Sequence, residues 1–387
     1  MFVFVIDRLK RSRNESITTE METAAEYLRN VERGECCSIV VVLLSTGDRR
    51  IWTRYCKDTN LCDDFVTSVY QSSRGFLFES DQYWRGLQQI IKQYQEEIKE
   101  QNYCGSSAWQ VMTLFKRYIL ITGATDGIGQ HTAQQLAKNG ENFVIIHGRS
   151  EERIEKSRKL IQDKCGSDGN NLGTIRADFA RMKDVAAMAE ELKVKFPNLN
   201  VVVCNAGVLI PKRQLSEDGI EMAFQVNHLA HFLLCNKIAD LLQKNKPSRV
   251  AVVSSICHDW YPMAWSDMEA KTDYEKYTQY SRTKLMNLMF AFAFARRMKD
   301  TGVCVNGLEP GVIQTKLLRA GGFSGSPVEQ GSRASVHLAQ SSELEGVTDK
   351  YYNNSGKLTR ANDESRNVEL QEKLWTLSQD YCTRLGV

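Results

Sequence analysis

Short apolar runs alternate with longer amphipathic segments along most of this chain. From Tyr118 onward the apolar runs have the length of buried strands, and they cover residues 118–122, 143–147, 173–177, 200–204, 249–254 and 303–308. The segments between them carry apolar residues at helical spacing. Strands that alternate with helices predict right-handed βαβ units. We therefore expect an α/β fold with a Rossmann-like, doubly wound parallel sheet of about seven strands.

The first part of the chain has a different pattern. An apolar run over 38–44, turn chemistry at Thr46-Gly47-Asp48 and an alternating run over 51–55 predict a strand and a returning strand. Apolar spacing predicts helices over 17–31 and 87–98, and residues 101–110 resemble a linker. The pattern thus predicts two domains: a small α+β region over 1–110 and an α/β domain over 111–387.

Composition narrows the class of protein. The chain has 387 residues, of which 42% are hydrophobic and 25% charged, with a net charge of +3. A net charge this small gives no electrostatic reason to expect nucleic-acid binding. No apolar run reaches the roughly 18 residues that a membrane-spanning helix needs. Eleven scattered cysteines without paired Cys-x2-Cys motifs predict no metal site and reduced thiols. We expect a cytoplasmic protein, with peripheral membrane association left open.

A glycine-rich turn follows the first strand of the α/β part. Its sequence is Thr122-Gly123-(x3)-Gly127-Ile128-Gly129, and apolar spacing predicts a helix over 131–138 directly after it. Glycines let the backbone approach a pyrophosphate, and the helix N-terminus supplies N–H donors. The motif predicts a dinucleotide site, although an ordinary βα turn is the alternative.

The end of the second strand bears on the choice of dinucleotide. NAD-specific sites of this kind place a carboxylate there for the ribose 2′-hydroxyl, but here Gly148 is followed by Arg149. A guanidinium suits a 2′-phosphate, so NADP(H) is expected as the preferred cofactor, with NAD(H) as the alternative. Asp126 in the glycine turn argues against this, and Arg149 could be a solvated charge. Asp178, after the third strand, is a candidate adenine ligand or a helix N-cap before Met182.

A tyrosine and a lysine four residues apart are the candidate proton-transfer pair. Of the 14 tyrosines, only Tyr280 is followed by a lysine at that spacing, Lys284, which places both on one helical face. A neighbouring ammonium and a positive nicotinamide ring would lower the tyrosine pKa from about 10. We expect Tyr280 to act as a general acid–base near neutral pH.

Two further polar residues are candidates for the catalytic set. Ser255 ends the strand over 249–254, at the edge where open parallel sheets bind ligands, and we prefer it to Ser254 as a donor to a substrate carbonyl. Asn227 follows the apolar Phe224-Gln-Val stretch and could relay protons towards Lys284. A strand-end capping serine and a satisfied core asparagine are the structural alternatives.

In their order and spacing, these motifs resemble the short-chain dehydrogenase/reductase family over residues 117–387. The resemblance implies Tyr280 as acid–base, Lys284 as its electrostatic partner and ribose ligand, Ser255 as carbonyl donor and Asn227 as relay. It further implies cofactor-binding roles for Thr122, Gly123, Gly127, Ile128, Gly129, Arg149, Asp178, Asn205, Ala206, Gly207, Tyr280, Lys284, Pro310, Gly311 and Thr315.

Two stretches, Val253–His258 and Lys373–Ser378, resemble retinol dehydrogenases and the WW-domain oxidoreductase. That resemblance implies a lipophilic alcohol or carbonyl as substrate and is compatible with a homodimer. Gly321, Gly322 and Gly325 suggest a mobile lid. Residues of about 20–100 weakly resemble part of a TPM-type domain. The rival hypothesis is a catalytically weak dinucleotide-binding scaffold that acts through this N-terminal region.

Overall fold

The computed structural model describes residues 3–6, 40–45, 50–55, 117–165, 169–315 and 324–387. The chain divides into two units, Met1–Leu114 and Phe115–Val387. In the first unit, β1 (Val3–Ile6) pairs in parallel with β2 (Val40–Ser45), which pairs antiparallel with β3 (Arg50–Tyr55). The expected strand and returning strand are confirmed. The helices and linker predicted around them lie outside the described residues.

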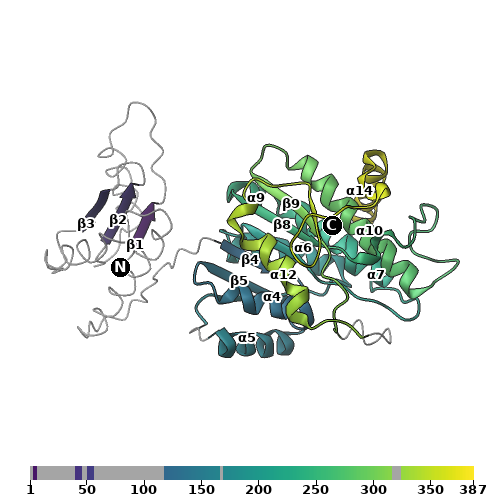
Figure 1. The fold of residues 1–387 in the computed structure, drawn as a ribbon, viewed down its shortest axis with the longest axis horizontal. Coiled ribbons are helices and arrows are strands. Elements are labelled where there is room, and N and C mark those ends of the chain that lie inside the picture. Colours follow the sequence, from purple (N-terminus) through teal and green to yellow (C-terminus); the bar gives the residue numbers. More distant parts are fainter. Residues whose placement is uncertain (1–2, 7–39, 46–49, 56–116, 166–168, 316–323) are drawn as a thin grey trace. The chain divides into compact units, whose positions relative to one another are not determined.

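The second unit is built on a seven-stranded parallel sheet (Figure 1). Its strands are β4 (Arg117–Ile121), β5 (Asn142–Gly148), β6 (Leu172–Arg176), β7 (Val201–Cys204), β8 (Ser248–Val253), β9 (Val303–Leu308) and β10 (Tyr351–Tyr352). They lie in the order β10-β9-β8-β7-β4-β5-β6. The predicted doubly wound sheet is confirmed, and its seventh strand is only two residues long, too short for an apolar pattern to show.

Helices cover both faces of this sheet because successive strand residues point to opposite sides. Ile119 and Ile121 of β4 pack with α4 (Gly127–Ala137), α5 (Glu151–Cys165) and α12 (Val328–Gln340). Leu120, between them, packs on the other face with α6 (Met182–Lys195), α8 (Ala230–Lys237) and α10 (Lys276–Arg297). These three side chains of β4 are fully buried. An uninterrupted apolar run therefore contributes to two hydrophobic cores, one on each face of the sheet.

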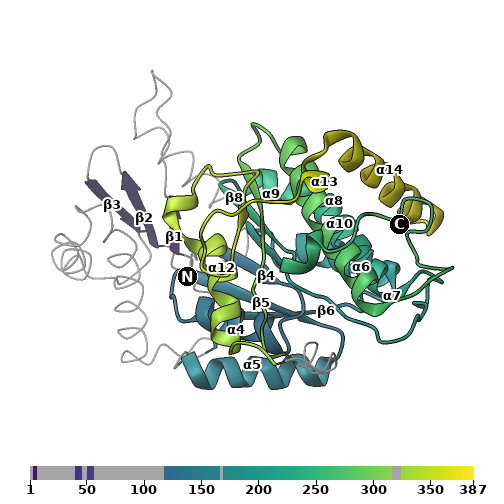
Figure 2. The same ribbon diagram turned by 45° about the vertical axis from the view of Figure 1, so that its right-hand side comes forward.

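Four further helical segments contact α10: α7 (Met222–Phe224), a π-helical turn (Gln225–Leu229), α13 (Asp363–Arg366) and α14 (Val368–Arg384). The short α9 (Ala239–Lys244) contacts α8 and β8. α14 packs on α10 (Figure 2). Trp375 of α14 and Phe294 of α10 contribute to this contact, with ring centres 6.3 Å apart. Among the described residues, no helix combines the length and apolar character needed to cross a bilayer.

Side-chain caps set where two helices begin, and α4 begins earlier than the 131–138 that the apolar pattern predicts. α4 starts at Gly127 because the Asp126 carboxylate accepts a hydrogen bond from the Gly127 amide. α10 starts at Lys276, where Glu275 caps the first turn through the Thr278 amide. Both caps are polar side chains that satisfy otherwise unbonded amides. As a result, both catalytic candidates lie inside α10, Tyr280 in its second turn and Lys284 in its third.

The strand order reverses beside β4, which has β5 on one side and β7 on the other. Crossover helices leave in opposite directions from such a point, so the carboxyl ends of the strands border a crevice. The segments after β4, β5, β7, β8 and β9 all meet there, and they carry the polar motifs of the sequence.

The core strands should respond strongly to loss of volume. Ile145 in β5 is fully buried, so Ile145→Ala is expected to lower the free energy of unfolding by about 2–5 kcal/mol. Val194→Ala is the matched control, because Val194 is 80% exposed in α6 and should change it by less than about 0.5 kcal/mol. Urea denaturation measures both variants, and equal effects would contradict the assignment of this core.

Candidate active site

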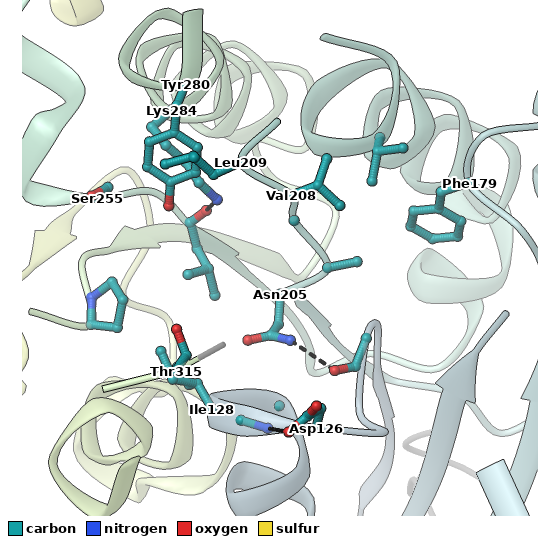
Figure 3. Close-up of a pocket in the computed structure, with 18 of the residues that line it drawn as sticks. Asp126, Ile128, Phe179, Asn205, Val208, Leu209, Ser255, Tyr280, Lys284 and Thr315 are labelled. Carbon is teal, nitrogen blue, oxygen red and sulfur yellow. Dashed lines mark hydrogen bonds between the residues drawn. The ribbon is translucent and has the colours of Figure 1, made fainter. Parts of the chain in front are cut away.

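A cavity of about 870 Å³ lies at the carboxyl ends of the strands (Figure 3). Its walls are the glycine turn, the ends of β5 and β6, the segments that follow β7, β8 and β9, and the first turns of α10. The predicted site residues that line it are Gly123, Gly127, Ile128, Gly129, Arg149, Asp178, Asn205, Ala206, Gly207, Ser255, Tyr280, Lys284, Pro310, Gly311 and Thr315. Thr122 and Asn227 are buried behind this lining.

The glycine turn is packed so tightly that side chains would not fit. Gly123 has a φ of +66°, and a Cβ on it would lie 2.9 Å from the Cα of Ala206. A Cβ on Gly129 would lie 2.4 Å from the Gly123 carbonyl oxygen. Glycine is therefore required at both positions. The turn brings backbone and the N-terminus of α4 directly to the cavity wall, where an anion could be held.

Thr122 fastens this turn to the strand beside it. Its hydroxyl oxygen accepts hydrogen bonds from the amides of Asn205 and Ala206, at 2.8 and 2.9 Å. The Asn205 side chain donates back to the Thr122 carbonyl at 2.8 Å. His231 Nδ1 lies 2.9 Å from the Asn227 carbonyl and its Nε2 lies 2.9 Å from the Thr122 hydroxyl. Since a carbonyl only accepts, Nδ1 donates to it and Nε2 accepts from Thr122.

Charged side chains gather where the cavity reaches β5. Arg149 is exposed and lines the wall, as does Arg153 of α5. An Arg153 nitrogen lies 3.4 Å from the Asp126 carboxylate, whose other oxygen accepts from the Gly127 amide at 2.8 Å (Figure 3). The carboxylate that argued against a 2′-phosphate is thus paired with a guanidinium. No motif of the sequence points to Arg153, because it lies in the first turn of a helix that is rich in charged residues.

Asp178 lines the same end of the cavity. Its carboxylate accepts a hydrogen bond from the Ala180 amide at 3.0 Å, so it caps a turn. The alternative that it caps α6 is wrong, because the residue at that position is Arg181 and the Met182 amide bonds to Asp218 at 2.7 Å.

His147 joins the glycine turn to β5 and β6. Its Nδ1 accepts from the Gly123 amide at 3.1 Å, and its Nε2 donates to the Ala177 carbonyl at 3.1 Å. Burial lowers the pKa of His147 to about 4. The pKa values of His228 and His231 are lowered to about 3, chiefly by burial. These three rings are therefore neutral at pH 7. His147 lines the cavity and His231 bonds to Thr122 behind it, whereas His228 bonds to Ser378 of α14.

α10 places Tyr280 and Lys284 on the cavity wall. The Lys284 ammonium lies 5.5 Å from the Tyr280 ring centre and donates to the Val253 carbonyl at 3.2 Å. Burial lowers the pKa of Lys284 to about 8. Burial also raises the pKa of Tyr280 above its usual value, and a hydrogen bond with Ser255 acts in the opposite direction. The sequence predicts a lowered tyrosine pKa, but in the protein by itself burial outweighs the nearby groups.

The two serines after β8 have different surroundings. The Ser254 hydroxyl donates to the Lys284 carbonyl at 2.7 Å and is held inside the fold. The Ser255 hydroxyl lies towards Tyr280 (Figure 3). It caps a short 3-10 helix, Ile256–Asp259, by accepting from the Cys257 amide at 3.3 Å. The preference for Ser255 over Ser254 as a donor to substrate agrees with these contacts.

Asn227 occupies the middle of the π-helical turn and is fully buried. Its side-chain oxygen accepts from the Val208 amide at 2.7 Å, and its nitrogen donates to the Val208 carbonyl and the Thr283 hydroxyl at 3.0 and 2.9 Å. A Cβ placed on Gly207 would lie 3.4 Å from both the Asn227 oxygen and the Lys284 nitrogen. The two polar groups thus face one small space beside Gly207.

The wall after β9 is formed by Pro310, Gly311 and Thr315. Gly311 has a φ of +84°, and its amide donates to Glu309 at 2.6 Å. The predicted lid glycines Gly321 and Gly322 lie outside the described residues. The cavity lining also has an exposed apolar part: Ile256 and Trp260, after β8, and Val312, within the wall after β9, are 49%, 55% and 48% exposed.

Comparisons with known proteins agree with this geometry. A family model described as short chain dehydrogenase matches residues 117–321. Retinol dehydrogenase 14 of Mus musculus is 36% identical over 287 residues, which cover 67% of this chain and 84% of that protein. The WW domain-containing oxidoreductase of Danio rerio is 32% identical over 307 residues, 73% of each chain. The resemblance of the N-terminal region to a TPM-type domain stays a prediction.

Solved structures show the same fold. A protein of Mycobacterium paratuberculosis superposes with a TM-score of 0.57 at 23% identity, covering 72% of this chain and 98% of that one. A short chain dehydrogenase of Pseudomonas syringae gives a TM-score of 0.52 at 19% identity, covering 65% of this chain and 99% of that one.

The buried neutral histidines predict acid sensitivity. For His147 the pKa is about 4 in the folded state and about 6.5 in the unfolded state. The unfolded chain therefore binds more protons between these values, and stability falls as the pH drops from about 6.5 to 4. Removing the ring with His147→Gln should reduce the loss of unfolding free energy between pH 7 and 5 by about 2 kcal/mol. Denaturant titrations at both pH values test this, and an unchanged loss would refute it.

Proposed function

Because the chain belongs to the short-chain dehydrogenase family, and so is an NAD(P)-dependent oxidoreductase that acts on CH–OH groups, we propose that it is specific for NADP(H) and interconverts lipophilic alcohols with their carbonyl compounds. Tyr280 is the general acid–base of this reaction. The observation that carries the proposal is the convergence of Tyr280, Lys284 and Ser255 at one part of a cavity whose opposite part holds the glycine turn and two guanidinium groups.

The cavity fits a dinucleotide in size and in lining. Its volume of about 870 Å³ lies at the upper end of the range for cofactor sites. The backbone at Gly123 and the first turn of α4 would hold the pyrophosphate, and Lys284 would hold the ribose on the nicotinamide side. When bound, NADP(H) supplies or accepts the hydride. The chain's own residues bind and orient both reactants and move the proton.

Tyr280 holds the proton that completes carbonyl reduction. Burial keeps its hydroxyl protonated in the protein by itself, which is the state that a proton donor needs. In the opposite direction, the positive charges of Lys284 and of an oxidised nicotinamide favour the phenolate and allow Tyr280 to accept a proton. Ser255 donates to the substrate oxygen and fixes it beside the tyrosine. The Asn227 oxygen, across the space beside Gly207 from Lys284, is placed to hold a water that passes protons onward.

The exposed apolar part of the lining supports a lipophilic substrate. Ile256, Trp260 and Val312 leave about half of their surfaces exposed there, and Leu209 and Met222 continue the lining inward. Exposed apolar surface of this kind is costly in water and marks a binding site. The names of the retinol dehydrogenase relatives support a substrate of the same chemical class.

Tyr280→Phe should abolish turnover and leave cofactor binding intact. The substitution removes the proton donor but keeps the ring, so kcat for carbonyl reduction is expected to fall by at least about 10³-fold while the NADPH dissociation constant changes less than about threefold. The measurements are NADPH oxidation with a panel of aldehydes and ketones, and NADPH fluorescence titration.

Tyr261→Phe is the control for this experiment, because Tyr261 is exposed and lies outside the cavity lining. The turnover of this variant should equal that of the wild type. Unchanged turnover in Tyr280→Phe would disprove the acid–base assignment. Cofactor binding by the wild type without turnover on any substrate would favour the scaffold hypothesis instead.

Removal of either guanidinium at the β5 end should weaken the preference for NADPH. A charge-assisted hydrogen bond to a phosphate contributes about 1.5–3 kcal/mol, so Arg149→Ala and Arg153→Ala are each expected to lower the NADPH-over-NADH ratio of kcat/KM by about 10- to 100-fold. Arg158→Ala is the control, since Arg158 lies on the same helix and pairs with Glu155 at 3.0 Å. A ratio that stays at the wild-type value in both variants would overturn the assignment.

A further inference from the structure

A buried carboxylate lies directly behind the wall that follows β9. Glu309 is 9% exposed and immediately precedes Pro310 and Gly311, both of which line the cavity. One of its oxygens accepts from the Gly311 amide at 2.6 Å, and the other accepts from the Asn354 amide at 3.0 Å. Both bonds are to backbone. In the described part of the chain, no lysine, arginine or histidine forms an ion pair with it.

The charge of Glu309 reaches the neighbouring polar groups. Burial raises the pKa of Tyr351, and the negative charge of Glu309 raises it further. The Tyr351 hydroxyl lies 3.4 Å from the carbonyl oxygen of Ser255. β8 and β9 pair in register up to Val253 and Leu308, so Glu309 follows β9 beside the segment that carries Ser255. Its neighbours Pro310 and Gly311 line the same cavity as Tyr280 and Lys284.

Burying a carboxylate without a cation costs free energy that two neutral amides only partly offset. A cation that binds nearby in this water-poor surrounding recovers part of that cost. Only the oxidised form of the cofactor can act as such a cation, since its nicotinamide ring carries a positive charge and the reduced ring is neutral. Glu309 and Lys284 have opposite effects on the binding of the oxidised ring: the carboxylate of Glu309 attracts its positive charge, and the ammonium of Lys284 repels it.

We propose that Glu309 makes the site bind NADP⁺ more tightly relative to NADPH, and so shifts the equilibrium between bound reactants towards carbonyl reduction. The inference rests on the proposed function and adds a direction to it. In that direction two electrons and a proton pass together as hydride from the reduced cofactor to the carbonyl carbon, Tyr280 gives its proton to the carbonyl oxygen, and the nicotinamide ring is left with a positive charge. A nearby fixed negative charge stabilises this product side.

The test is the pair of dissociation constants for NADP⁺ and NADPH, measured by calorimetry at one salt concentration. Glu309→Gln removes the charge and keeps the size, and it is expected to weaken NADP⁺ binding by on the order of three- to tenfold more than NADPH binding. Glu309→Asp keeps a charge while it disturbs the bonds to Gly311 and Asn354, so it should weaken both forms about equally. Glu343→Gln, at an exposed site, is the control and should change neither.

The ratio of the two constants separates the outcomes. A ratio that moves in Glu309→Gln and stays in Glu309→Asp supports the inference. Equal weakening of both forms in Glu309→Gln would mean that Glu309 only holds the turn, and the inference would fall while the proposed function stands. A wild-type protein that binds neither nucleotide would remove the proposed function and the inference together.

Discussion

The buried hydroxyl of Thr122 is the contact on which the geometry of the site depends. It accepts from two successive amides after β7, so β4 and β7 end in a fixed relation to each other. The glycine turn begins at the next residue, and the Asn205 side chain bonds back to it. This junction lies where the strand order reverses, and it holds the glycine turn against the Asn205–Gly207 segment on the cavity wall.

Much of this arrangement could be predicted from the sequence. Apolar runs predicted the strands, and parallel strands bring their carboxyl ends to one edge, so motifs far apart in the chain were expected to meet. Ser255 and Tyr280, which lie 25 residues apart, are linked instead by the order and spacing of the family's motifs. Strand-end motifs are readable because their positions follow from the sheet alone.

Other features depend on contacts that no local pattern encodes. Arg153 looks like any solvated residue of a polar helix until its distance to Asp126 is known. No local pattern marks the charged Glu309 as buried, and one of its two bonds comes from Asn354, 45 residues away, which only the fold brings close. The raised pKa of Tyr280 follows from burial, which outweighs the nearby charges. Burial and pairing of this kind are properties of the packed structure.

The π-helical turn over Gln225–Leu229 has a consequence for the length of the chain. A π turn holds one residue more than the α-helical turns on either side of it. Deletion of one residue there would restore a regular α-helix and leave Phe224 and His231, on either side of the turn, near their places, because the wider turn absorbs its extra residue. Asn227, inside the turn, would then shift away from Val208 and Thr283, to which its side chain now bonds. The number of residues in this segment is therefore as much a requirement of the site as their identity.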